Sequence, residues 1–289
     1  MPGARRFAPA LALVLNALIW GTSWWPFRQL HDAGLHPLWT TALVYLMAVV
    51  VIGLARPAAW REVAQTPALW LILLASGTTN AAFNWGVTIG DVVRVVLLFY
   101  LMPLWAVLLA RMVLHEALTR AAVLRVAMAL GGALIVLWPE DGAGPGPVKL
   151  TDALGLLGGF SFALNNVMLR REAARSEGAR SLAMFVGGAV VAAGLALALG
   201  NERVPPPPWL SAGWVAAAVL LSAMFLLSNL ALQFGAARLP ANTTAVIMLT
   251  EVVFASASAL ALGAGSLTPA LMLGGGLIVG AAVLAAWRP

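Results

Sequence analysis

The sequence lacks cysteine and contains few charged residues. Its 289 residues include no cysteine and only 10% charged residues, against 62% hydrophobic residues. The absence of cysteine excludes disulfides, thiolate nucleophiles and cysteine-ligated metal sites. An ordinary soluble domain is about one quarter charged. A soluble fold of this length could not bury so much apolar surface, so lipid must be the solvent for much of the chain.

A recognisable catalytic constellation is also lacking. The histidines, His31, His36 and His115, lie in or near predicted loops and have no ligand spacing with carboxylates. Buried serines lack a nearby base, and one acid within an apolar segment does not make a metal site. We therefore expect neither an enzyme nor a bound metal or cofactor. The net charge of +6 lies in short loops, where we expect it to meet anionic membrane lipid and not nucleic acid.

Ten apolar segments, each near the length of about 20 residues that crosses a bilayer, divide the chain. They are residues 7–27, 37–55, 67–88, 92–112, 121–138, 152–170, 181–199, 211–234, 240–262 and 269–287. Thirteen of the seventeen Lys and Arg residues lie in alternate gaps between these segments. Cytoplasmic loops retain Lys and Arg, so the pattern predicts a multi-pass membrane protein with both termini in the cytoplasm.

A Gly/Pro-rich linker, residues 139–151, separates five predicted spans in residues 1–138 from five in residues 152–289. Sliding Phe99–Trp138 onto Met248–Trp287 without a gap gives nine identities in forty positions. An odd number of spans makes the two five-helix repeats enter the membrane in opposite senses. The sequence therefore predicts an all-α integral membrane protein with a 5+5 inverted-topology repeat, an arrangement common among secondary transporters.

Glu251 is the only acidic residue near the middle of a predicted span. It lies about eleven residues into its segment, which at 1.5 Å per residue corresponds to a depth of about 16 Å. A carboxyl group at that depth suits proton coupling or a contact with a substrate amine. The alternative is a protonated or hydrogen-bonded acid that ties this helix to a neighbour.

Amide, aromatic and methionine side chains within the spans complete the predicted substrate site. These candidates are Trp20, Trp24, Asn80, Phe83, Asn84, Tyr100, Met102, Trp105, Asn165, Asn166, Ser228, Asn229 and Met248. Amides can bind a zwitterion without the desolvation cost of a full charge, flat rings stack on aromatic substrates, and methionine forms adaptable walls. For any single amide, an interhelical hydrogen bond worth about 0.6 kcal/mol is the simpler interpretation.

Several short motifs resemble those of one transporter family. They are Trp20-Gly21-Thr22-Ser23 (family WGSS), Tyr100-Leu101-Met102-Pro103, His115-Glu116-Ala117-Leu118-Thr119 (family GE-x-LT) and Thr250-Glu251-Val252-Val253-Phe254 (family EPVF). On these motifs the chain resembles the drug/metabolite transporter (DMT) superfamily, EamA type, and within it the YddG-type exporters of aromatic amino acids. It departs from the family pattern at Val252, where proline is usual, and at Gly265, where glutamate is usual.

The resemblance implies a ten-helix exporter of metabolites with a central cavity. We expect a secondary transporter of the bacterial inner membrane that exports amino acids, with aromatic ones favoured, by alternating access. Its partners would be a small-molecule substrate and membrane lipid. A transporter of another small metabolite or drug-like solute is the alternative, and the oligomeric state stays open.

Overall fold

The computed structural model describes residues 2–113, 115, 120–137, 148–207, 213–236, 238, 247–248 and 250–287, and this part of the chain is helical without strands. Six helical stretches are long and apolar enough to cross a membrane: Ala8–Asp32, Pro37–Ala55, Val92–Val113, Leu150–Arg171, Glu177–Leu199 and Trp214–Leu232. The prediction of an all-α protein with several membrane-spanning helices is therefore confirmed. The count of ten spans goes beyond these six and remains a prediction.

In the described residues the helices follow the predicted segments, with differences at their ends; residues 240–246 and 249 of the predicted span 240–262 lie outside the described residues. The helices are α1 (Pro2–Thr22), α2 (Trp24–Asp32), α3 (Pro37–Ala55), α4 (Ala58–Gln65), α5 (Pro67–Ile89), α6 (Val92–Phe99), α7 (Met102–Val113), α8 (Arg120–Leu137), α9 (Leu150–Arg171), α10 (Glu177–Leu199), α11 (Gly213–Ala236), α13 (Thr250–Ala261) and α14 (Pro269–Trp287). Helix α4 was not predicted, because an eight-residue amphipathic helix that buries only Ala59 and Val63 carries too short a periodic pattern.

Two of the predicted spans are interrupted. Between α1 and α2, the Ser23 hydroxyl and amide both donate to the Trp20 carbonyl, at 2.8 and 3.3 Å, and this local bonding competes with the helical pattern. Between α6 and α7 the chain turns at Tyr100 and Leu101. Pro103 follows and has no N–H to donate to the preceding turn. Both interruptions lie beside the candidate site described below.

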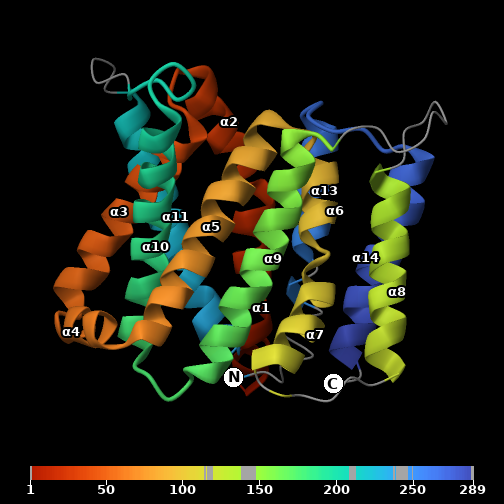
Figure 1. The fold of residues 1–289 in the computed structure, drawn as a ribbon, viewed down its shortest axis with the longest axis horizontal. Coiled ribbons are helices and arrows are strands. Elements are labelled where there is room, and N and C mark those ends of the chain that lie inside the picture. Colours follow the sequence, from red (N-terminus) through yellow and green to blue (C-terminus); the bar gives the residue numbers. More distant parts are fainter. Residues whose placement is uncertain are drawn as a thin grey trace.

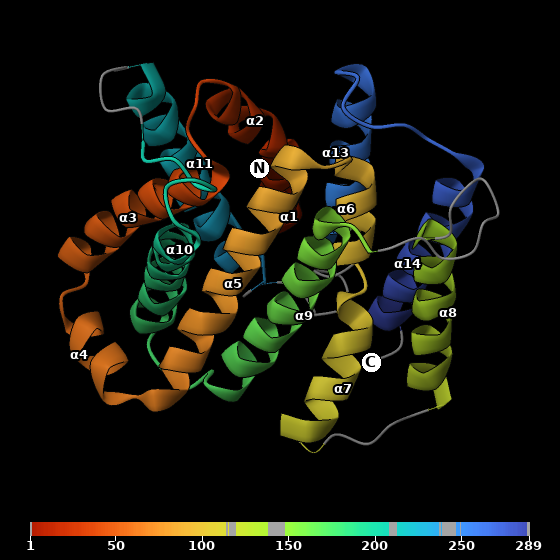
Figure 2. The same cartoon turned by 45° about the horizontal axis from the view of Figure 1, so that its top comes forward.

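Helices from the two halves of the chain (residues 1–138 and 152–289) pack against one another. Helix α9 lies on α5, α10 lies on α3 and α5, α11 and α13 lie on α1, and α14 lies on α8. The α8–α14 and α5–α9 pairs lie side by side in both Figures 1 and 2. Both termini lie at one end of the bundle, together with α4, the end of α7 and the start of α8 (Figure 1).

Helices α5 and α10 approach closely because glycines face each other. A Cβ added to Gly187 would collide with the carbonyl of Leu73, and one added to Gly77 would collide with the carbonyl of Gly187. Small residues let transmembrane helices approach until their backbones touch. This contact buries α5 despite its polar residues, which include Ser76, Thr79, Asn80 and Asn84.

We expect Gly187→Ala to destabilise the protein, because the added methyl group must push α10 away from α5, at a cost of about 1–3 kcal/mol. Gly194→Ala is the matched control on the same helix, since nothing lies within 4 Å of an added Cβ there. Thermal unfolding in detergent should show a lower Tm for Gly187→Ala and an unchanged or higher Tm for Gly194→Ala. Equal Tm values for the two variants would contradict this helix contact.

His36 caps α3 in a way that requires its neutral form. Its Nδ1 atom accepts a hydrogen bond from the backbone N–H of Leu38 at 3.2 Å, and a protonated Nδ1 cannot accept. Burial, and then the nearby His31, lower the pKa of His36 from 6.5 to about 4. The unfolded chain therefore binds more protons than the folded chain between pH 6.5 and 4, so stability from this group falls as the pH drops through that window.

We expect His36→Asn to make stability less dependent on pH, because asparagine also caps helices but does not titrate. The measurement is Tm in detergent at pH 7.5 and pH 5 for both proteins. The original protein should lose more stability on acidification than the variant. The same loss in both proteins would show that other groups cause it.

Candidate functional site

Glu251 meets Tyr100 in the interior, and the two residues come from different halves of the chain. The Tyr100 hydroxyl lies 3.0 Å from Glu251 Oε2 and 3.2 Å from the backbone carbonyl of Met248. Both side chains are buried, with exposed fractions of 1% for Tyr100 and 7% for Glu251. The structure thus brings three of the predicted site residues together, two of them from the motifs that carry the family resemblance.

The two acceptors around one hydroxyl accommodate both protonation states of Glu251. With an ionised carboxylate, the Tyr100 proton points to Glu251. With a protonated carboxyl group, Glu251 donates to the Tyr100 oxygen, and Tyr100 donates to the carbonyl of Met248. A tyrosine hydroxyl can donate and accept at once, so either state keeps its hydrogen bonds. The arrangement can therefore exchange a proton, or a cation in its place, without leaving a buried donor unpaired.

The Trp20-Gly21-Thr22-Ser23 segment holds α1 against α13 beside Glu251. A Cβ on Gly21 would lie 2.8 Å from the carbonyl oxygen of Glu251, so only glycine permits this approach. One turn further on, Trp24 Nε1 donates to the Ser258 hydroxyl of α13 at 2.9 Å. Gly21 is thus needed for close packing of the backbones, whereas Trp24 forms a hydrogen bond between the two halves.

A row of aromatic rings crosses the interior next to this pair. Trp20 stacks on Phe225 with ring centroids 4.8 Å apart and meets Phe83 edge-on at 6.1 Å. Phe83 contacts Phe99 at 4.8 Å, and Phe99 contacts Tyr100 at 6.0 Å. The row includes rings from α1, α5, α6 and α11 and ends at the Tyr100–Glu251 pair.

Three of the predicted amide and hydroxyl candidates pair with neighbouring helices. Asn80 Oδ1 accepts from the Tyr45 hydroxyl at 2.5 Å, and Asn84 donates to Thr41 at 3.2 Å, so both join α5 to α3. The Ser228 hydroxyl accepts from Asn16 at 2.6 Å and joins α11 to α1. For these three residues the structure shows the simpler alternative, an interhelical hydrogen bond.

The remaining candidates differ in how far they face the interior. Asn165 is buried and its Oδ1 has no hydrogen-bond partner in the described part of the chain, whereas the adjacent Asn166 is exposed on α9. Met102 and Trp105 are partly buried against the hydrophobic cluster that contains Tyr100. The Trp105 ring meets Phe160 edge-on at 5.4 Å, and its Nε1 is buried without a partner among the described residues. Asn229 is partly buried on α11.

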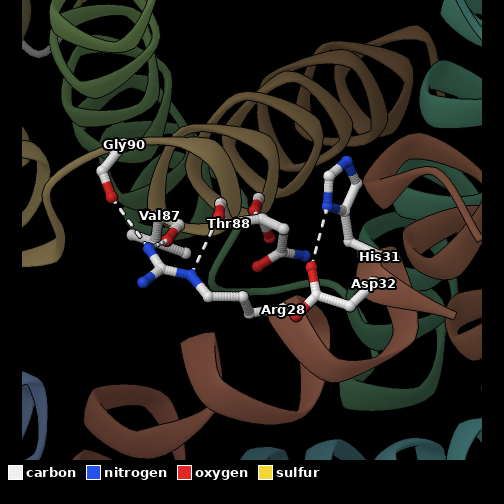
Figure 3. Close-up of polar contacts among 7 residues, drawn as sticks. Arg28, His31, Asp32, Val87, Thr88 and Gly90 are labelled. Atoms are coloured by element: carbon white, nitrogen blue, oxygen red, sulfur yellow. Dashed lines mark hydrogen bonds and ion pairs between the residues drawn. The ribbon is translucent and has the colours of Figure 1, made fainter. Parts of the chain in front are cut away.

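Arg28 ties α2 to the end of α5, at the end of the bundle opposite the termini. Its guanidinium group donates to the carbonyls of Val87, Thr88 and Gly90 at 3.2, 3.1 and 2.8 Å (Figure 3). It also lies over the Trp24 ring, 5.1 Å from the centroid. The last carbonyls of a helix carry partial negative charge, so a cation stabilises them.

Polar contacts between the halves gather at this same end. Arg94 at the start of α6 binds Asp152 of α9 through two oxygens, at 2.7 and 3.2 Å, and the Asp152 side chain is 2% exposed. Asp91, which caps α6, also accepts from the amide of Ser266 at 3.3 Å. Together with Trp24 and Ser258, these contacts join the first half to the second on one side of the Tyr100–Glu251 pair.

Several residues of the site were missed from the sequence. Phe99, Phe225 and Tyr45 lie in apolar runs and carry no local signal that separates them from lipid-facing residues. The Arg94–Asp152 pair had a signal, since Arg94 is one of only four basic residues outside the thirteen sorted ones. A basic residue in a gap that is otherwise poor in Lys and Arg suggests a partner within the protein, and for Arg94 this partner is the buried Asp152. Among the described residues no group of three or more His, Asp or Glu side chains could hold a metal ion.

We expect Asp152→Asn to destabilise the protein by about 2 kcal/mol, because it weakens two hydrogen bonds to a charged group and leaves Arg94 without its counterion. Thermal unfolding in detergent should show a lower Tm, while Asp32→Asn should change little, since the Asp32 side chain is 64% exposed. Indistinguishable Tm values for the two variants would show that the ion pair does not hold the halves together.

One family model matches part of the chain. Residues 8–138 match the EamA-like transporter family, whose members are transporters and not enzymes. One crystal structure of a protein superposes with a TM-score of 0.63 at 18% identity, over 96% of this chain and 96% of that chain, and at this identity the likeness shows the fold alone. No curated protein sequence matches the chain. The chain is thus a multi-pass membrane protein, and its residues 8–138 are similar to the EamA-like transporter family.

Proposed function

We propose that this protein is a secondary transporter of the bacterial inner membrane that exports amino acids, with aromatic ones favoured. The observation that carries the proposal is the Tyr100–Glu251 pair at the end of a row of aromatic rings. An acid beside flat rings matches the two ends of an aromatic amino acid, which carries an ammonium group next to a ring. The YddG-like resemblance supports the same substrate class.

The residues of the site have separate roles in this proposal. The ammonium group of the substrate binds Glu251, and the Tyr100 hydroxyl then donates to the carbonyl of Met248. The substrate ring packs among Trp20, Phe83 and Phe99, where offset and edge-on contacts are favourable. The unpaired Nε1 of Trp105 supplies a donor for the substrate carboxylate. Because the carboxylate of Glu251 is neutralised either by a proton or by the substrate amine, transport of the substrate would be coupled to transport of protons.

In this proposal the transporter works by alternating access, in which two inverted repeats move against each other around the site. The first helix of each half contacts the third and fourth predicted spans of the other half, since α1 packs on α11 and α13 while α9 packs on α5, α6 and α7. This is the exchange of contacts that a pseudo-two-fold axis in the membrane plane would give. In this proposal ten spans form two five-helix repeats, residues 1–138 and 152–289, which are joined by the linker of residues 139–151. Because Tyr100 and Glu251 are buried, a substrate reaches them only when the halves move.

Uptake into liposomes tests the substrate class. The purified protein is reconstituted, and the entry of labelled Phe, Trp, Thr and Met is measured with and without a pH gradient. We expect transport of Phe and Trp above protein-free liposomes and above Thr. Absence of transport for every amino acid would overturn the proposal and favour another small metabolite or drug-like solute as the cargo.

Substitution at the buried pair tests the site. We expect Glu251→Gln to reduce transport of Phe roughly tenfold or more and to remove its dependence on the pH gradient, because a charge-assisted contact of about 1.5–3 kcal/mol is lost. Tyr100→Phe, which keeps the ring, should alter the pH dependence and retain transport. Glu202→Gln is the control, since Glu202 is exposed in a loop. An unchanged rate and pH dependence in Glu251→Gln would remove its proposed role.

A further inference from the structure

Helix α4 and the first turn of α10 form a basic surface at the end of the bundle that carries the termini (Figure 1). Residues 56–65 and 170–180 contain six arginines and three glutamates. We define the α4 arginine cluster as Arg56, Arg61, Arg175 and Arg180. This surface takes no part in the site described above, and it lies where apolar helices end.

The contacts between α4 and α10 bring these arginines together. Glu62 of α4 accepts from the backbone amide and the hydroxyl of Ser176, at 3.1 and 2.6 Å, and so fixes α4 on the N-terminus of α10. A Cβ on Gly178 would lie 3.5 Å from Arg56, which places the Arg56 stem against α10. The bonds from Ser176, and then the charges of Arg175 and Arg180, lower the pKa of Glu62, so both arginines lie near this junction.

The arginines keep unused capacity to bind an anion. Two carboxylates lie among them: Glu62 is held by Ser176, and Glu172 pairs with Arg175 at 3.5 Å, a distance that leaves this pair weak. The Nε of Arg180 is buried and has no hydrogen-bond partner among the described residues. The described part of the protein thus leaves at least one N–H of the Arg180 guanidinium group unused. Phosphate fits, because guanidinium groups bind its oxygens through paired hydrogen bonds.

Two tryptophans indicate that the anion belongs to a lipid. Trp60 of α4 and Trp70 at the start of α5 are 45% and 53% exposed, and Trp70 Nε1 donates to the carbonyl of Val63. Tryptophan rings concentrate at the level of lipid headgroups, with one face in the apolar layer. Basic pockets between transmembrane helices on the cytoplasmic side bind anionic headgroups. The rings and the arginines therefore share one depth in the bilayer.

We propose that the α4 arginine cluster binds the headgroup of an anionic phospholipid. The phosphate lies against Arg56, Arg175 and Arg180, and the acyl chains lie along the exposed faces of Trp60 and Trp70. Because α4 joins α3 to α5 in the first half and α10 belongs to the second half, the bound lipid clamps the two halves together at this end of the bundle.

Lipid-dependent thermal unfolding of the purified full chain in detergent tests the site. Added phosphatidylglycerol should raise the Tm, and phosphatidylcholine or inorganic phosphate at the same concentration should not. We expect Arg56→Gln/Arg175→Gln to weaken phosphatidylglycerol binding roughly 30-fold, at about 1 kcal/mol for each arginine near the membrane surface. The control is Arg120→Gln/Arg203→Gln, which removes the same charge from two other exposed positions.

The outcomes separate the possibilities, and none depends on transport. A shift retained by the control and lost by the cluster variant supports the site. Equal shifts with both lipids, an equal loss in both variants, or a shift produced by inorganic phosphate alone would overturn it. If the cluster variant does not fold, Arg56→Lys/Arg175→Lys replaces it, since lysine keeps the charge and loses the paired hydrogen bonds. That variant should then bind phosphatidylglycerol more weakly than the original protein, and unweakened binding would contradict the proposal.

Discussion

The structure depends on the absence of water inside the bilayer, because every polar group there needs a partner within the protein. The backbone meets this requirement by forming helices. Several polar side chains meet it in pairs, and four such pairs join segments that are distant in sequence: Tyr100 with Glu251, Tyr45 with Asn80, Asn16 with Ser228, and Arg94 with Asp152. Three of these four pairs join the two halves. Polar pairing thus specifies which helices pack together, because lipid gives apolar helix surfaces little preference for one neighbour over another.

Close backbone contact is the second source of cohesion, and it explains where glycine occurs. Gly187 lets α10 touch α5, and Gly21 lets α1 touch α13 next to Glu251. Gly21 links the two effects, because the approach that it permits places the carbonyl of Glu251 against α1 while the carboxyl group reaches Tyr100. The family motif around Gly21 is therefore a packing element that positions the site.

The basic residues divide into two groups with different physical roles. Arg28 and Arg94, which lie outside the thirteen sorted residues, are engaged with helix carbonyls and with Asp152. The clustered arginines around α4 and α10 lie at the end of the bundle with the termini and carry a surplus of positive charge. One group stabilises contacts within the protein at one end, and the other is available to lipid at the opposite end. The halves are thus tied differently at their two ends.

The sequence by itself determined the helical class, the presence of several helices apolar enough to cross a membrane and the interior position of Glu251, because hydropathy and charge are local properties of the chain. It could not determine the partner of Glu251, since Tyr100 lies 151 positions away and only packing brings the two together. Nor could it separate amides that pair with a neighbouring helix, such as Asn80, from an exposed one such as Asn166, because both occur in equally apolar runs. The row of rings was decided by tertiary structure, because the contacts of each ring depend on which helices pack against it.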